Sequence, residues 1–131
     1  MIGLDTNVLV RYLAQDDARQ SPRATRLIES LTSAQPGFVS HVVLAETVWV
    51  LESCYGADAR KIAEVIDTLL RIDGLVVDRA DIVWQALREF TQRPGDFPDV
   101  LIAAIGRSAG CASVQTFDQG AARRAGMTLL G

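Results

Sequence analysis

The sequence predicts an α/β fold in which helices cover both faces of a central, mainly parallel sheet, an α/β/α sandwich of three layers. Short apolar runs typical of buried strands alternate with longer segments whose apolar residues recur at helical spacing. Strands separated by helices are typical of parallel pairing, because a parallel connection must cross the length of the sheet. A length of 131 residues fits one core, so we expect a single domain over residues 1–131.

Cap and turn residues mark the elements expected in the first half of the chain. Ser21 followed by Pro22 is typical of an N-cap and a first-turn proline. Ser40 and Asp58 stand where they can cap the helices that follow them, and Gly56 ends the helix between them. We expect strands at 2–4 and 38–40, and helices at 8–14, from 21 to 31, at 43–55 and from 58 to about 74.

The second half shows the same alternation. Asp78, with Asp81 three residues later, resembles a capping box that uses the shorter acid. Asp96 is expected to cap a further helix, with Pro98 in its first turn. We expect strands at 75–77, 112–117 and 127–130, and helices from 78 to the break at 94–95, at 100–108 and at 121–125.

Composition excludes several classes of protein. No apolar run approaches the roughly 18 residues needed to cross a bilayer, and no secretory signal is visible, so we expect a cytoplasmic protein without membrane contact. Cys54 and Cys111 show no metal or redox spacing and are expected to be free, mostly buried thiols. A net charge of −3 argues against a generic nucleic-acid binder. It does not exclude a metal-dependent nuclease, because bound cations neutralise site carboxylates.

Four of the sixteen acids are not explained by helix caps or solvated helix faces. Asp5 follows the first strand, and Asp118 follows the strand at 112–117. Glu46 lies inside an almost wholly apolar stretch, so we expect it to lack a solvated face of its own. Asp99 lies in the first turn of another apolar helix.

These acids are expected to converge, because strand carboxyl ends and the following helix N-termini share one edge of a parallel sheet. Like charges held close together need a cation between them or a shared proton. Oxygen ligands suit Mg²⁺ or Mn²⁺. Taken singly, each acid also has a structural interpretation: Asp5 as a helix cap, Asp99 as a first-turn acid favoured by the helix dipole, and Asp118 as a turn residue.

With these residues the chain resembles the PIN-domain ribonucleases, and more closely the VapC toxins of bacterial toxin–antitoxin pairs. The resemblance covers nearly the whole chain and rests on four motifs in order: Leu4-Asp5-Thr6-Asn7-Val8-Leu9, Leu44-Ala45-Glu46, Asp96-Phe97-Pro98-Asp99-Val100-Leu101-Ile102-Ala103-Ala104 and Thr116-Phe117-Asp118. It implies an Mg²⁺- or Mn²⁺-dependent endoribonuclease toxin with an RNA substrate. It also implies a VapB-like antitoxin as partner, and a homodimer.

The resemblance assigns roles to individual residues. Asp5 and Asp99 would be direct metal ligands, while Glu46 and Asp118 would complete the shell, orient the water or hold a second metal. The residues that match supporting positions are Thr6, Asn7 and Thr116. The basic residues expected to contact RNA phosphates are Arg107, Arg123 and Arg124. The third motif holds two aspartates, and Asp99 is favoured over the cap Asp96 because the apolar run follows it.

Other interpretations stay open at this point. The chain could be a non-toxin PIN-domain nuclease of RNA processing, or a non-catalytic α/β binding module whose acids are caps, although Glu46 argues against the latter. A phosphatase of the aspartyl-nucleophile type needs a second aspartate where Asn7 stands, which counts against it. His41 lacks a recognisable catalytic partner and is interpreted as structural. Trp84 is expected in the core, while Trp49 fits either the core or an interface.

Overall fold

The computed structural model describes all 131 residues and confirms the α/β class with parallel strand pairing. Each predicted helix and strand has a counterpart, and most differ only in their ends. The elements are β1 (Ile2–Gly3), α1 (Thr6–Ala14), α2 (Gln20–Ser30), β2 (Gly37–Val39), α3 (His41–Tyr55), α4 (Ala59–Arg71), β3 (Leu75–Val77), α5 (Ala80–Gln92), α6 (Phe97–Ser108), β4 (Gln115–Thr116), α7 (Gln119–Arg124) and β5 (Thr128–Leu129).

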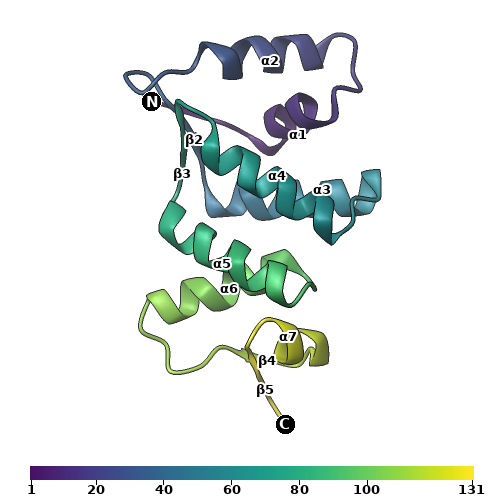
Figure 1. Cartoon of the computed structure of the whole chain (residues 1–131), viewed down its shortest axis with the longest axis vertical. Coiled ribbons are helices and arrows are strands. Elements are labelled where there is room, and N and C mark those ends of the chain that lie inside the picture. The colour runs from purple at the N-terminus through teal and green to yellow at the C-terminus, as the bar shows by residue number, and fades with distance from the viewer.

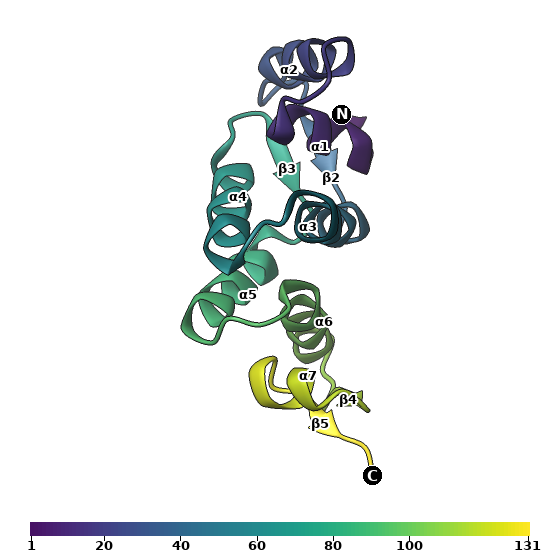
Figure 2. The ribbon, with the colours of Figure 1, turned by 90° about the vertical axis from the view of Figure 1, so that its right-hand side faces the viewer.

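The strands are divided between two parallel sheets rather than gathered into one. The first sheet has the order β1-β2-β3, and the second consists of β4 and β5 alone. The molecule is elongated, and the two sheets lie on either side of α5 and α6 along its long axis (Figures 1 and 2). No pairing joins β1 to β4, so both are edge strands.

One face of the three-stranded sheet is only partly covered. The strand register places Gly3, Phe38 and Val76 side by side on this face. Phe38 is half-buried, while Gly3 and Val76 are exposed. The neighbouring residues Val39 and Val77, which point the other way, are buried. The helices that follow β3 do not cover the open face, because α5 packs on α4 and α6, and α6 also contacts α3.

The apolar core continues from the helices beside the sheet into the C-terminal part of the chain. A cluster of 26 buried residues includes side chains of α1, α3, α4, α5, α6 and α7. Phe97, at the start of α6, is fully buried and meets the ring of Phe90 edge-on, with centroids 5.6 Å apart. Buried side chains therefore hold α6 against its neighbouring helices.

Three of the predicted helix caps are confirmed. The Ser40 hydroxyl accepts the Val43 N–H at 3.1 Å, and the Asp58 carboxylate accepts the Lys61 N–H at 2.9 Å. Asp96 caps α6 in the same way. Each of these side chains satisfies one of the backbone donors that an α-helix leaves free in its first turn.

Two cap predictions were wrong, because a neighbouring side chain competes for the role. Ser21 is buried inside α2. The Asp17 carboxylate instead accepts the backbone N–H groups of Arg19 and Gln20 at the start of the helix. Asp78 does not cap α5. That position is taken by Arg79, which has a left-handed backbone (φ 42°) and a guanidinium paired with the Asp81 carboxylate at 3.0 Å.

Two features concern the surface of the molecule. Cys54 and Cys111 are free, as expected, but both are exposed, so the prediction that they are buried was wrong. None of the helices is long and apolar enough to cross a membrane.

Candidate active site

The first acid pair consists of Asp5 and Glu46, joined through Thr6. Asp5 follows β1 and caps α1: its carboxylate accepts the Thr6 N–H at 2.8 Å. The Thr6 hydroxyl donates to Glu46 Oε1 at 2.9 Å. Asp5, Thr6, Glu46, Asn7 and Trp49 line one pocket. Asp5 is therefore a helix cap and also a carboxylate beside a second acid, so the two interpretations of this residue are compatible.

Glu46 is exposed, which corrects the expectation that it lacks a solvated face. Val42 and Trp49 lie on the same side of α3, four residues before and three residues after Glu46, and are 69% and 64% exposed. The opposite side of α3 carries Leu44 and Val48, which are both buried. Glu46 thus lies on an apolar helix face that nothing in the chain covers, and Trp49 is not a core residue.

The second acid pair consists of Asp99 and Asp118, at the N-terminal ends of α6 and α7. Asp118 caps α7 by accepting the Gly120 N–H at 2.7 Å. Asp96 caps α6 by accepting the Asp99 N–H at 3.0 Å, as the sequence predicts. Asp96, Asp99, Asp118 and Arg124 line one pocket. The carboxylate of Asp99 makes no cap contact of its own, so it is free to bind a ligand.

Asp99 lies in an unfavourable electrostatic environment. Burial raises the pKa of its carboxyl above the ordinary value, and the negative charges of Asp96 and Asp118 raise it further. The pKa of Glu52, on α3, is also raised, by burial and by the charge of Asp96. An additional carboxylate thus stands near the second pair. The sequence did not single it out, because nothing local relates Glu52 to Asp96.

The charge effect of Asp96 on Glu52 indicates which part of α3 the start of α6 lies near. Glu52 is six residues after Glu46, which is about 9 Å along the helix axis and roughly 120° around it. The N-terminus of α6 therefore faces a different part of α3 from the part that carries Glu46. The expected convergence of four carboxylates is not observed: no three acidic, histidine or cysteine side chains are placed to hold a metal ion.

The residues predicted to support the site differ in what they contact. The Thr116 hydroxyl accepts the Asp118 N–H at 3.0 Å and so orders the turn before α7. Arg124 lines the second pocket and donates to the Pro94 carbonyl oxygen at 2.8 Å. Arg107 is occupied by a two-pronged ion pair with Glu89, at 2.7 and 2.9 Å. Arg123 is exposed on α7.

Comparison with known proteins settles the family. The sequence model of the PIN domain matches residues 2–127, a stretch that contains all four candidate acids. The chain belongs to the PIN domain family.

Two individual proteins are similar to this PIN domain chain. A VapC ribonuclease of Aquifex aeolicus (strain VF5) is 26% identical over 114 residues, which cover 87% of this chain and 84% of the relative. The crystal structure of VapC20 of Mycobacterium tuberculosis, described as a toxin that cleaves the sarcin–ricin loop, aligns over 98% of this chain and 97% of its own. That alignment has 24% identity and a TM-score of 0.46.

Two further features of the PIN domain chain lie apart from the acids. His41 Nε2 lies 2.6 Å from the Asp78 carbonyl oxygen, so the ring nitrogen is the donor and the histidine ties α3 to the end of β3. Trp84 is half-buried against the core, with the Arg71 guanidinium 5.0 Å from its ring centroid. Both fit the structural roles expected of them.

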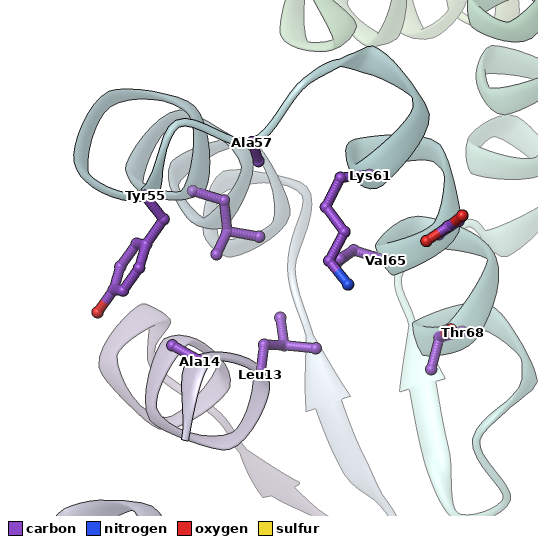
Figure 3. Close-up of a pocket in the computed structure, with 9 residues that line it drawn as sticks. Leu13, Ala14, Tyr55, Ala57, Lys61, Val65 and Thr68 are labelled. Atoms are coloured by element: carbon purple, nitrogen blue, oxygen red, sulfur yellow. The ribbon is translucent and has the colours of Figure 1, made fainter. Parts of the chain in front are cut away.

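Another pocket lies between α1, α3 and α4 (Figure 3). It is lined mainly by apolar side chains, including Leu13, Leu51 and Val65, and Lys61 also lines it. Glu64 is the one acid that lines this pocket, so the four candidate acids lie outside it.

Proposed function

We propose that this chain is a VapC-type endoribonuclease that uses Mg²⁺ or Mn²⁺ to hydrolyse phosphodiester bonds in RNA. The observation that carries the proposal is the PIN domain match across all four acids. The relative named a VapC ribonuclease, which aligns over most of both chains, supports the narrower class. The proposed role is that of a toxin, acting on RNA in the cytoplasm and restrained by a VapB-like antitoxin.

The donor atoms of the two acid pairs fit a hard divalent cation. They are carboxylate and hydroxyl oxygens, without a histidine or cysteine that would favour a softer metal. Burial, and then the charges of Asp96 and Asp118, raise the pKa of Asp99, so its negative charge is held at a cost that a cation would relieve. We assign Asp5 and Asp99 as direct ligands, with Glu46 and Asp118 completing the shell.

The chemistry divides between the cation and the chain. A divalent cation held by these acids would supply Lewis-acid chemistry, polarising a phosphoryl oxygen and making water a better nucleophile near neutral pH. In the chain, Thr6 holds Oε1 of Glu46, which would leave Oε2 to orient the attacking water. Thr116 orders the turn that presents Asp118. In-line attack by water would leave a 5′-phosphate and a 3′-hydroxyl.

Two side chains beside the acids suit an unpaired stretch of RNA. Trp49 is largely exposed next to the first pair, where a base that has left its stack could lie on the indole ring. Arg124 stands beside the second pair and offers its guanidinium to a phosphate. These contacts favour a loop or single strand over a regular duplex.

Cleavage of a labelled RNA by the purified chain tests the proposal. We expect cleavage with Mg²⁺ or Mn²⁺, none with EDTA, and 5′-phosphate products. Asp5→Asn and Asp99→Asn should each lower the rate more than about a hundredfold, since the loss of even a residue that only orients a ligand costs 10–100-fold. Glu64→Gln, in an exposed ion pair on α4, is the matched control and should leave the rate unchanged. Full activity of both aspartate variants would refute the assigned site.

A non-catalytic binding role is the second candidate, and the division of the acids into two pairs favours it. Wild-type protein that binds RNA but does not cut it with either metal would support this role. If the chain is a nuclease, its expression in cells separates a toxin from a nuclease of RNA processing. A toxin should arrest growth, and a small protein encoded beside this gene should relieve the arrest.

A further inference from the structure

β1, β3, β4 and β5 each have a free edge, and β1 and β4 are the two that lead to candidate acids. β1 pairs only with β2, and β4 pairs only with β5. A free edge leaves backbone N–H and C=O groups unpaired and open to another strand. The β4–β5 sheet is also short, with two residues in each strand, and such a pair gains little stability alone. Both edges therefore stand to gain from a further strand.

β1 and β4 lead to acids at matching positions. Asp5 lies two residues after Gly3, the last residue of β1, and Asp118 lies two residues after Thr116, the last residue of β4. If β1 and β4 paired in parallel with these ends level, the two aspartates would meet at one corner of the joined sheet. Glu46 would come with Asp5, and Asp99 with Asp118, because each already shares a pocket with that residue.

The packing of α6 opposes this pairing within one chain. α6 buries Phe97 and Val100 completely and contacts α3 and α5, and the charge of Asp96 acts on Glu52. To reach Glu46, the start of α6 would have to move by about two helical turns along α3. That movement would break up the core that holds α5 and α6 to the rest of the molecule.

We propose that a second copy of this chain completes the site: β4 of one protomer pairs with the free edge of β1 of its partner, and the second acid pair of one protomer joins the first acid pair of the other. This inference rests on the nuclease function proposed above for the same acids. Because each protomer offers the edges of both β1 and β4, a twofold arrangement pairs each β1 with a β4 and forms two composite sites. Neither protomer has to unpack its core.

The shape and surface of the molecule fit such an exchange. The β1 and β4 strands lie on opposite sides of α5 and α6 along the long axis, so two copies side by side and head to tail would bring each β1 to a β4 (Figures 1 and 2). Large apolar side chains are exposed near both edges. Trp49 flanks Glu46, and Phe117, which is 80% exposed, directly precedes Asp118. Exposed apolar groups of this kind are typical of an interface.

A cross-linking experiment tests the pairing without relying on activity. In the full chain with Cys54→Ser and Cys111→Ser, Ile2→Cys and Gln115→Cys place one thiol on β1 and one on β4, three residues before Asp5 and Asp118. We expect mild oxidation to give a covalent dimer on a non-reducing gel. Mixing the two single-cysteine chains should give the same dimer, while each alone should not.

Every other result of that experiment counts against the proposal. A link inside the monomer would show that the strands meet within one chain, no link would show that they do not meet, and a ladder of larger species would exclude twofold closure. Ile2→Cys combined with Arg60→Cys, whose position on α4 is exposed and far from the acids in sequence, is the matched control and should stay monomeric on the gel.

Activity provides the second test. Asp5→Ala and Asp99→Ala chains should each be inactive, while an equal mixture of the two should recover about a quarter of wild-type activity. Half of the dimers in the mixture contain one chain of each kind, and each such dimer has one intact site of its two. An inactive mixture of chains whose wild type is active would place the site within one protomer. An inactive wild type that still forms the covalent dimer would contradict the nuclease function and leave the exchange standing.

Discussion

The hydrogen bond from Thr6 to Glu46 directly links the residue that follows Asp5 to the second acid of the first pair. Thr6→Val keeps the shape of the side chain and removes the donor, so Glu46 loses its orientation. We expect the RNA cleavage rate to fall about tenfold, the value of one such hydrogen bond. Thr6→Ser should restore most of the rate. Equal rates for the valine and serine variants would show that the hydroxyl has no part in positioning Glu46.

Asp99 makes stability depend on pH in a definite direction. Its pKa is raised in the folded chain, so the folded state binds the proton more tightly than the unfolded state. The free energy of unfolding therefore falls as pH rises from the ordinary value of the carboxyl through the raised value. Asp99→Asn removes the charge and should unfold at a higher temperature than wild type at neutral pH.

The difference between Asp99→Asn and wild type should vanish below about pH 3, where the carboxyl is protonated in both states. Thermal unfolding in EDTA over a series of pH values measures it. Mg²⁺ should stabilise wild type more than the variant. A variant that unfolds at a lower temperature at neutral pH would contradict the assigned electrostatics.

For single residues, the sequence predicted which acids belong to the candidate site better than it predicted what surrounds those acids. Asp5, Glu46, Asp99 and Asp118 were singled out because caps and solvated faces did not explain them all. Yet Asp5 and Asp118 are caps as well, and Glu46 is exposed. An apolar stretch predicts a buried helix only when other elements cover every side of that helix. One side of α3 is uncovered, so Glu46 on that side is exposed.

At the scale of elements, the N-cap of α6 separates a structural aspartate from a candidate ligand. Asp96→Ala removes the acceptor of the Asp99 N–H and should lower the free energy of unfolding by about 1 kcal/mol. Asp96→Ser keeps a capping oxygen without the charge, so stability and RNA cleavage should both stay near wild type. Denaturant unfolding and the cleavage assay measure the two effects. A large loss of cleavage in the serine variant would make Asp96 a ligand.

The sequence predicted the elements well because their signals are local. Helical periodicity and caps such as Ser40 and Asp58 depend on residues within one or two turns. The errors arose where two polar residues compete for one role. Asp17 displaced Ser21, and the pairing of Arg79 with Asp81 left Asp78 outside the cap. Propensity alone does not rank such competitors, because the outcome depends on side-chain geometry.

At the scale of the whole molecule, a site made by two protomers should depend on protein concentration. We expect the specific activity of RNA cleavage to fall on dilution, in parallel with the fraction of dimer measured by light scattering or analytical ultracentrifugation. The covalent dimer of Ile2→Cys and Gln115→Cys should keep its specific activity at the same dilutions. Wild-type activity that is independent of concentration while the protein dissociates would contradict a composite site.

From the sequence we predicted the α/β class, the order of helices and strands, the four acids and the resemblance to PIN-domain ribonucleases, and the family match confirmed that resemblance. These features depend on local patterns and on residue identity. The separation of β1 from β4 and the division of the acids into two pairs became visible in the folded chain. The reason is physical: a strand's sequence indicates that it needs a neighbour, but backbone hydrogen bonds are alike for all strands. The partner is therefore chosen by the packing of the helices between them, here α5 and α6 against α3 and α4.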